Sequence, residues 1–161
     1  KSLFLLMATF YTLQQAQHKI EQYCAYQERC HEEVRTKLLS LKVYGDGLEE
    51  IINQLISEDF LNEERFAKAY AGGKFRMKKW GRSKIIQGLK ARKISDYCIK
   101  QGMTEIPEED YQKTLQSLVK SAIKKYHSGN IFETKSKSAN YLIGRGYESE
   151  LVWDAIQRNL K

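Results

Sequence analysis

The chain has 161 residues, of which 42% are hydrophobic and 29% charged, and it carries a formal net charge of +7 and one proline. This composition argues against a globally disordered chain, and so few helix breakers argue against a loop-rich β architecture. The odd number of cysteines (Cys24, Cys30 and Cys98) excludes a framework in which every cysteine is paired, so we expect reduced, buried thiols. The positive charge leaves nucleic acid, an acidic protein face and an anionic membrane open as partners.

The first feature in the chain is an apolar run at residues 3–10, which reads LFLLMATF. It is too short to span a bilayer, and it lacks the longer apolar core of a signal peptide. We therefore expect an apolar arm, or a first helical turn that packs on the body of the protein.

Helical periodicity dominates the rest of the chain. Leu48, Ile51, Ile52, Leu55 and Ile56, for example, follow the spacing of one buried helix face. No segment shows a convincing strand alternation. The sequence therefore predicts an all-α fold with nine helices, at residues 12–27, 31–42, 46–58, 62–78, 82–92, 95–102, 107–127, 132–144 and 148–160.

Local signals support several of these boundaries. Asn62 followed by two glutamates is typical of a helix start, and so are Ser95 and Pro107. The pair Gly129-Asn130 indicates a helix end. The adjacent glycines Gly72 and Gly73 should weaken the helix around them, and they could form a hinge between units.

Three stretches of the chain resemble one another. In each, a leucine lies five residues before an apolar turn residue, and the pairs are Leu38 and Val43, Leu89 and Ile94, and Leu142 and Tyr147. Each stretch is predicted as helix, tight turn, helix, with a longer helix before it. We therefore expect three three-helix units at residues 1–58, 59–106 and 107–161, arranged as an elongated, curved array. Such an array has a long concave face, which suits a large partner better than a small substrate.

The positive charge is concentrated in the middle unit. Residues 1–58 carry a net charge of −2, residues 59–106 carry +7 and residues 107–161 carry +2, and no Asp or Glu lies between Arg65 and Ser95. A dense basic run around a tryptophan and a glycine turn is what a phosphate-tracking surface needs. A solvated helix face, or a surface for an acidic protein, would have the same charge. The candidate contact residues are Lys74, Arg76, Lys78, Lys79, Trp80, Arg82, Lys84, Lys90, Arg92 and Lys93.

Sequence-specific DNA recognition is disfavoured. The second helix of the middle helix–turn–helix, residues 95–102, is poor in the Arg, Asn and Gln side chains that recognise base edges. Catalysis and metal binding are not indicated either. None of the three histidines lies in a catalytic pattern, and Cys24, Cys30 and His31 fit no common zinc spacing. We therefore do not expect an enzyme.

Several motifs resemble those of the RecX regulatory proteins. They are the stretch from Phe60 to Tyr70 (FLNEERFAKAY), the glycine turn and basic helix that begin at Trp80 (WGRSKI, then LKARKIS), the late Arg145-Gly146-Tyr147, and a first-unit motif from Tyr23 to Val34. The apolar run at residues 3–10 and the Gly72-Gly73 pair have no match in this pattern.

The resemblance implies tandem three-helix units that bind along the RecA nucleoprotein filament and restrain its ATP hydrolysis and strand exchange. It also implies binding to single-stranded or double-stranded DNA, a cytoplasmic location, a role in DNA repair, recombination and the SOS response, and no cofactor. We expect a monomer that does not bind membranes. The alternatives are a general, non-sequence-specific DNA-binding protein without a recombinase partner, and a scaffold that does not bind nucleic acid.

Overall fold

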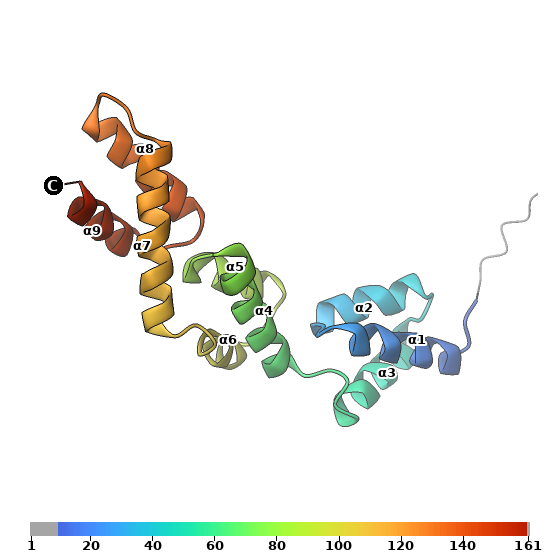
Figure 1. Cartoon of the computed structure of the whole chain (residues 1–161). Coiled ribbons are helices and arrows are strands. Elements are labelled where there is room, and N and C mark those ends of the chain that lie inside the picture. Colours follow the sequence, from blue (N-terminus) through green and yellow to red (C-terminus); the bar gives the residue numbers. More distant parts are fainter. Residues whose placement is uncertain (1–9, 161) are drawn as a thin grey trace, which may run out of the picture. The chain divides into compact units, whose positions relative to one another are not determined.

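The computed structural model describes residues 10–160, and within them every regular element is an α-helix (Figure 1). The all-α prediction is confirmed, and each of the nine predicted helices is present with ends within two residues of the expected ones. The predicted arm at residues 3–10 lies outside the described residues, apart from the exposed Phe10. The helices are α1 (Leu13–Tyr26), α2 (His31–Ser40), α3 (Gly45–Ser57), α4 (Glu63–Lys78), α5 (Arg82–Ala91), α6 (Asp96–Met103), α7 (Glu108–Lys125), α8 (Ile131–Gly144) and α9 (Ser149–Asn159).

The chain divides into two compact units, Lys1–Glu63 and Glu64–Lys161. The first contains α1 to α3, and the second contains α4 to α9. The expected boundary at residue 106 therefore lies inside the second compact unit. The division at residues 1–58, 59–106 and 107–161, and the curvature of the array, stay predictions.

The first unit is a small three-helix bundle. A capping box begins α1, because the Thr12 hydroxyl accepts from the Gln15 amide while the Gln15 side chain accepts from the Thr12 amide. Ile52 and Leu55 are buried as the periodicity predicts, but Ile56 is 44% exposed, so its predicted burial is wrong. A helix face only about 100° wide enters the core, and Ile56 lies at its edge. The core residues are Ala16, Ile20, Cys24, Val34, Leu38, Leu41, Val43, Leu48, Ile51, Ile52, Leu55 and Leu61.

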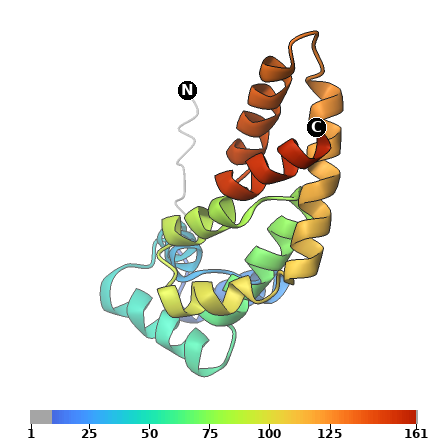
Figure 2. The same ribbon diagram turned by 90° about the vertical axis from the view of Figure 1, so that its left-hand side faces the viewer.

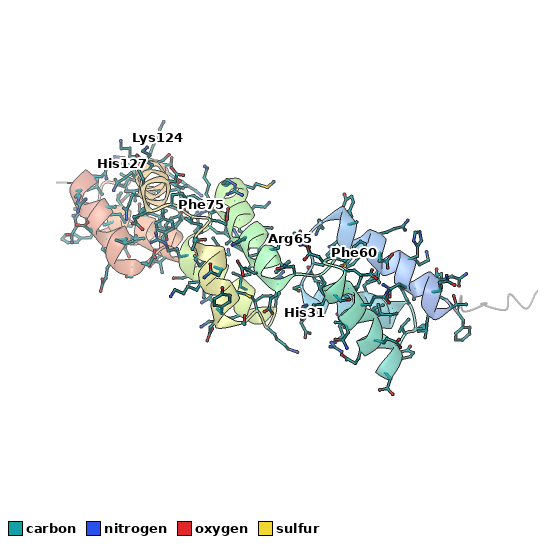
Figure 3. All side chains as sticks on the ribbon, turned by 90° about the horizontal axis from the view of Figure 1, so that it is seen from below. His31, Phe60, Arg65, Phe75, Lys124 and His127 are labelled. Atoms are coloured by element: carbon teal, nitrogen blue, oxygen red, sulfur yellow. The ribbon has the colours of Figure 1, made fainter. Side chains whose placement is uncertain are left out.

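The second unit joins two sets of three helices. In the views of Figures 1 and 2, α8 and α9 lie along the long helix α7, while α4, α5 and α6 form a second cluster beside its N-terminal end. Phe75, Tyr111 and Tyr147 connect the two sets through a buried ring cluster, with centroids 5.9 Å apart for Phe75 and Tyr111 and 5.2 Å for Tyr111 and Tyr147. Phe75 is labelled in Figure 3. Aromatic packing of this kind stabilises the connection between the two sets of helices, which we call the joint, beyond the simple burial of its area.

The three helices that precede the predicted repeat turns share one type of end. In α2, α5 and α8 a Schellman-type turn places a residue of positive φ between the helix and the next apolar side chain, and α3 and α4 end in the same way at Asp59 and Lys79. The turn residues are Lys42 (φ 63°), Lys93 (φ 57°) and Gly146 (φ 97°). The closing amide-to-carbonyl bonds are Val43 to Leu38 (3.1 Å), Ile94 to Leu89 (3.2 Å) and Tyr147 to Leu142 (3.2 Å).

The predicted helix starts are largely correct. The Ser95 hydroxyl caps α6 by accepting from the Cys98 amide, and Pro107 directly precedes α7. The interpretation of Gly129-Asn130 as the end of a helix is wrong, because α7 ends at Lys125 and the Asn130 side chain instead caps the start of α8. Asparagine serves both roles in helix capping, so its position alone was ambiguous. The glycine pair forms no break in the helix, since α4 runs without interruption through Gly72 and Gly73.

Candidate nucleic-acid and partner interface

The ten candidate contact residues all lie in the second compact unit, on α4, α5 and the turns that follow them. They differ sharply in how available they are to a partner. Five are exposed, namely Arg76, Lys78, Lys79, Lys90 and Lys93. The other five, Lys74, Trp80, Arg82, Lys84 and Arg92, are half-buried.

Trp80 lies between two of the candidate lysines. The Lys84 ammonium is 4.5 Å from the Trp80 ring centroid, and the Lys74 ammonium is 5.0 Å from it. Lys74 also lies 5.3 Å from the ring of Tyr70. These distances fall within the range of cation–π attraction. The structure thus brings Lys74, Trp80 and Lys84 together in one aromatic and cationic cluster.

Arg82 is bound within the unit. Its guanidinium forms ion pairs with Glu108 and, at 3.3 Å, with Glu148, and its Cζ lies 3.7 Å from the Tyr111 ring centroid. Burial acts to lower the pKa of Arg82, but the two carboxylates outweigh it and raise the pKa above its ordinary value. Arg82 therefore ties the start of α5 to α7 and to the start of α9.

Arg92 also has internal partners. Its guanidinium donates to the Gly88 carbonyl at 2.9 Å and lies 4.9 Å from the Tyr70 ring centroid. The Gly88 carbonyl belongs to the last turn of α5, so the side chain closes the C-terminal end of that helix. We therefore expect Arg92 to position the turn more than to reach a partner.

The two glycine motifs of the sequence meet in space. The Gly81 amide donates to the Arg145 carbonyl at 2.8 Å, and the Ser83 amide donates to the Gly146 carbonyl at 3.0 Å. Two side chains return to the end of α4: the Tyr147 hydroxyl donates to the Lys79 carbonyl at 3.0 Å, and the Arg145 guanidinium donates to the Lys78 carbonyl. The two motifs lie far apart in the sequence, and only the folded chain brings them into contact.

Tyr111 stands at the centre of the joint. Burial raises the pKa of Tyr111 above its ordinary value and raises the pKa of Tyr147 to about 12, so both hydroxyls stay protonated at neutral pH. The Tyr111 hydroxyl can therefore donate to Glu148, while it accepts from the Arg82 amide at 3.2 Å. The Tyr111 hydroxyl is thus both a donor and an acceptor within the unit, and it connects α5, α7 and the residue before α9.

The cysteines have the state that the sequence predicts. All three are buried and none forms a disulfide, and burial raises the pKa of Cys24 to about 11. Within residues 10–160 no group of histidine, cysteine and acidic side chains is arranged to hold a metal ion. In the same part of the chain, no helix has the length and apolarity needed to cross a membrane.

Comparison with known proteins finds similarity to RecX proteins. Residues 62–103 match the family model for the second three-helix domain of RecX. The Regulatory protein RecX of Clostridium acetobutylicum is 29% identical over 138 residues, which are 83% of this chain and 61% of that protein. The RecX of Bacillus mycoides is 22% identical over 130 residues, or 81% of this chain and 48% of that protein. The chain thus spans about half the length of the Bacillus relatives it matches.

Solved structures show the same fold. The crystal structure of RecX from Lactobacillus salivarius superimposes with a TM-score of 0.81 at 23% identity, covering 92% of this chain and 97% of that one. A second RecX crystal structure gives a TM-score of 0.78 at 19% identity, covering 91% of this chain and 73% of the other.

The helix–turn–helix repeats and the basic middle helices define an all-helical protein built from three-helix units. The proteins that it resembles are RecX regulatory proteins: the resemblance inferred from the motifs is confirmed, and residues 62–103 match the second three-helix domain of that family.

Proposed function

We propose that the protein is a RecX-like regulator that binds RecA nucleoprotein filaments and inhibits their ATP hydrolysis and strand exchange. In this role it would control DNA repair and recombination in the cytoplasm, and it would act by binding, without catalysis or a cofactor. The observation that carries the proposal is the match of residues 62–103 to the second three-helix domain of RecX. In this chain those residues include the basic stretch from Arg65 to Ser95 that contains no Asp or Glu, called here the acid-free run.

The structure refines which candidate residues the proposal uses. The exposed cations Arg76, Lys78, Lys79, Lys90 and Lys93 are the proposed contacts to RecA or to the DNA in its filament. Trp80, with Lys74 and Lys84 beside it, adds an aromatic group to this surface. Arg82 and Arg92 support the surface from within the unit.

The test is charge reversal at two exposed lysines on different helices, in a Lys78→Glu/Lys90→Glu variant. We expect loss of most of the inhibition of RecA-driven ATP hydrolysis, because both contacts would become repulsive. The matched control is Lys19→Glu/Lys100→Glu, which changes the net charge equally at two exposed lysines outside the acid-free run. Inhibition unchanged in the first variant, with circular dichroism showing intact helices, would contradict the proposal.

A general DNA-binding protein without a recombinase partner is the second candidate, and the basic surface favours it equally. The two candidates differ in what the chain binds. Co-sedimentation with RecA-coated single-stranded DNA should exceed that with bare DNA if RecA is the partner. Plain phosphate binding should instead lose affinity by orders of magnitude as salt rises, with no preference for the coated strand.

A further inference from the structure

A line of lysines follows the outer side of α7. Lys113, Lys120 and Lys124 are spaced seven and four residues apart, and at 3.6 residues per turn these positions lie within about 40° of one another around the helix. All three side chains are exposed, and Figure 3 shows Lys124 on the outer side of the helix. The opposite side of α7 is buried through Tyr111, Leu115, Val119 and Ala122.

This line is poor in acidic neighbours. The sequence contains no Asp or Glu from Tyr111 to Phe132. Lys113 forms an ion pair with Glu109 at 2.7 Å, whereas no carboxylate among the described residues pairs with Lys120 or Lys124. Two exposed serines, Ser117 and Ser121, lie between the lysines on the same side of the helix. The surface therefore presents cations and hydroxyl donors with little compensating charge.

The line joins the end of α4. A shallow hollow there is lined by Phe75, Arg76, Lys79, Asp110, Lys113 and Thr114. Three of its six residues are cations, and one of them, Lys113, is also the first lysine of the line. Asp110 is the single acidic group in the lining. The cations at the end of α4 are therefore continuous with those of α7.

The chemistry of this surface favours a nucleic acid over an acidic protein. Protein interfaces depend on buried apolar or aromatic anchors, and the outward positions of α7 from Lys113 to Lys124 hold only lysine and serine. Phosphate oxygens are bound by Lys, Arg, Ser and Thr side chains, which are the polar groups present here. A regular row of such donors suits the repeating charge of a phosphate backbone.

We propose that Arg76, Lys79, Lys113, Lys120 and Lys124 form a track for the phosphate backbone of DNA, extending the basic surface from α4 onto α7. The part on α7 is about 16 Å long, which corresponds to roughly five nucleotides of one strand. The track goes beyond the proposed function because three of its five residues lie outside the acid-free run. It would contact DNA whether or not a recombinase is present.

The test compares the full chain with a Lys120→Ala/Lys124→Ala variant, in direct binding to single-stranded and to duplex DNA over a range of salt. Alanine keeps the helix and removes the ammonium group together with the aliphatic stem that carries it. We expect the slope of log K against log salt to fall in magnitude by about 1.4 on single strands or about 1.8 on duplex, and the larger loss of affinity will identify the preferred form. The matched control is Lys19→Ala/Lys100→Ala, which should leave the slope nearly unchanged.

Two results would contradict the proposal that these residues bind the phosphate backbone of DNA. One is a slope and affinity equal to those of the parent chain, or changed only as much as in the control. The other is unchanged DNA binding together with loss of co-sedimentation with RecA-coated DNA, which would assign α7 to a protein partner. RecA is absent from the direct binding measurement, so its outcome is independent of the proposed regulatory function.

Discussion

Arg82 connects three helices of the second unit through a single guanidinium. Like Arg92, it lies in the acid-free run and binds groups within its own unit. The network also affects Glu108: a hydrogen bond from Gln112 and the ion pair with Arg82 lower the pKa of that carboxyl. A charge count alone treats these arginines and the exposed lysines alike, but their contacts give them different roles.

Gly146 shows why one position of the repeat differs from its counterparts. Lys42 and Lys93 occupy the equivalent turns at φ 63° and 57°, so this helix end tolerates a side chain. A Cβ at Gly146 would lie 2.4 Å from the Lys84 Cβ and 2.6 Å from the Lys84 amide nitrogen. Glycine is therefore required at residue 146 by the close approach of α5 as well as by its φ of 97°.

We predict that Gly146→Ala destabilises the protein by roughly 2–4 kcal/mol, from backbone strain together with overpacking against Lys84. The measurement is the free energy of unfolding in urea. Gly144→Ala is the control, because nothing lies within 4 Å of an added Cβ there. Equal effects in both variants would show that the contact between the two glycine turns does not hold the joint.

At the level of helices, α4 is the element that sequence propensity supports least. It contains Gly72 and Gly73 yet stays continuous, because Phe66, Ala67, Ala71 and Phe75 bury one face of it. Packing of an apolar face contributes more to a helix in a protein than its intrinsic propensity does. This explains why the glycine pair forms no hinge within the helix.

The same substitution should have opposite effects at two helical glycines. Gly73→Ala should stabilise the protein by about 0.5–1 kcal/mol, since the site is open and alanine is the better helix former. Gly102→Ala should destabilise it, because a Cβ on α6 would lie 2.7 Å from the Ala67 carbonyl oxygen of α4. Thermal unfolding of the two variants checks the signs, and a stabilising Gly102→Ala would contradict the close packing of α6 on α4.

On the scale of the whole chain, the two compact units have separate cores. The first closes its core with residues from Ala16 to Leu61, and the second builds its own around Phe75, Tyr111 and Tyr147. The contacts between α4–α6 and α7–α9 explain why these six helices form one unit although the sequence repeats every three.

We expect a fragment of residues 62–161 to fold without the rest of the chain. A length of about 100 residues is enough for an independent core, and the joint around Tyr111 lies wholly inside it. Circular dichroism should show helical content and a single cooperative unfolding transition. A fragment that stays unfolded would show that the first unit is needed for the second.

The sequence by itself determined the helices, the repeat and the location of the charge. These are local properties: apolar spacing marks each buried face, turn residues mark most ends, and the acid-free run from Arg65 to Ser95 is visible by counting. Only the tertiary structure decided which basic residues face solvent, because Arg82 finds its partners 26 and 66 residues away, at Glu108 and Glu148. It also decided that the turns at Gly81 and Gly146 are two sides of one contact, since a backbone pairing over that separation depends on how the helices pack and leaves no periodic trace in the sequence.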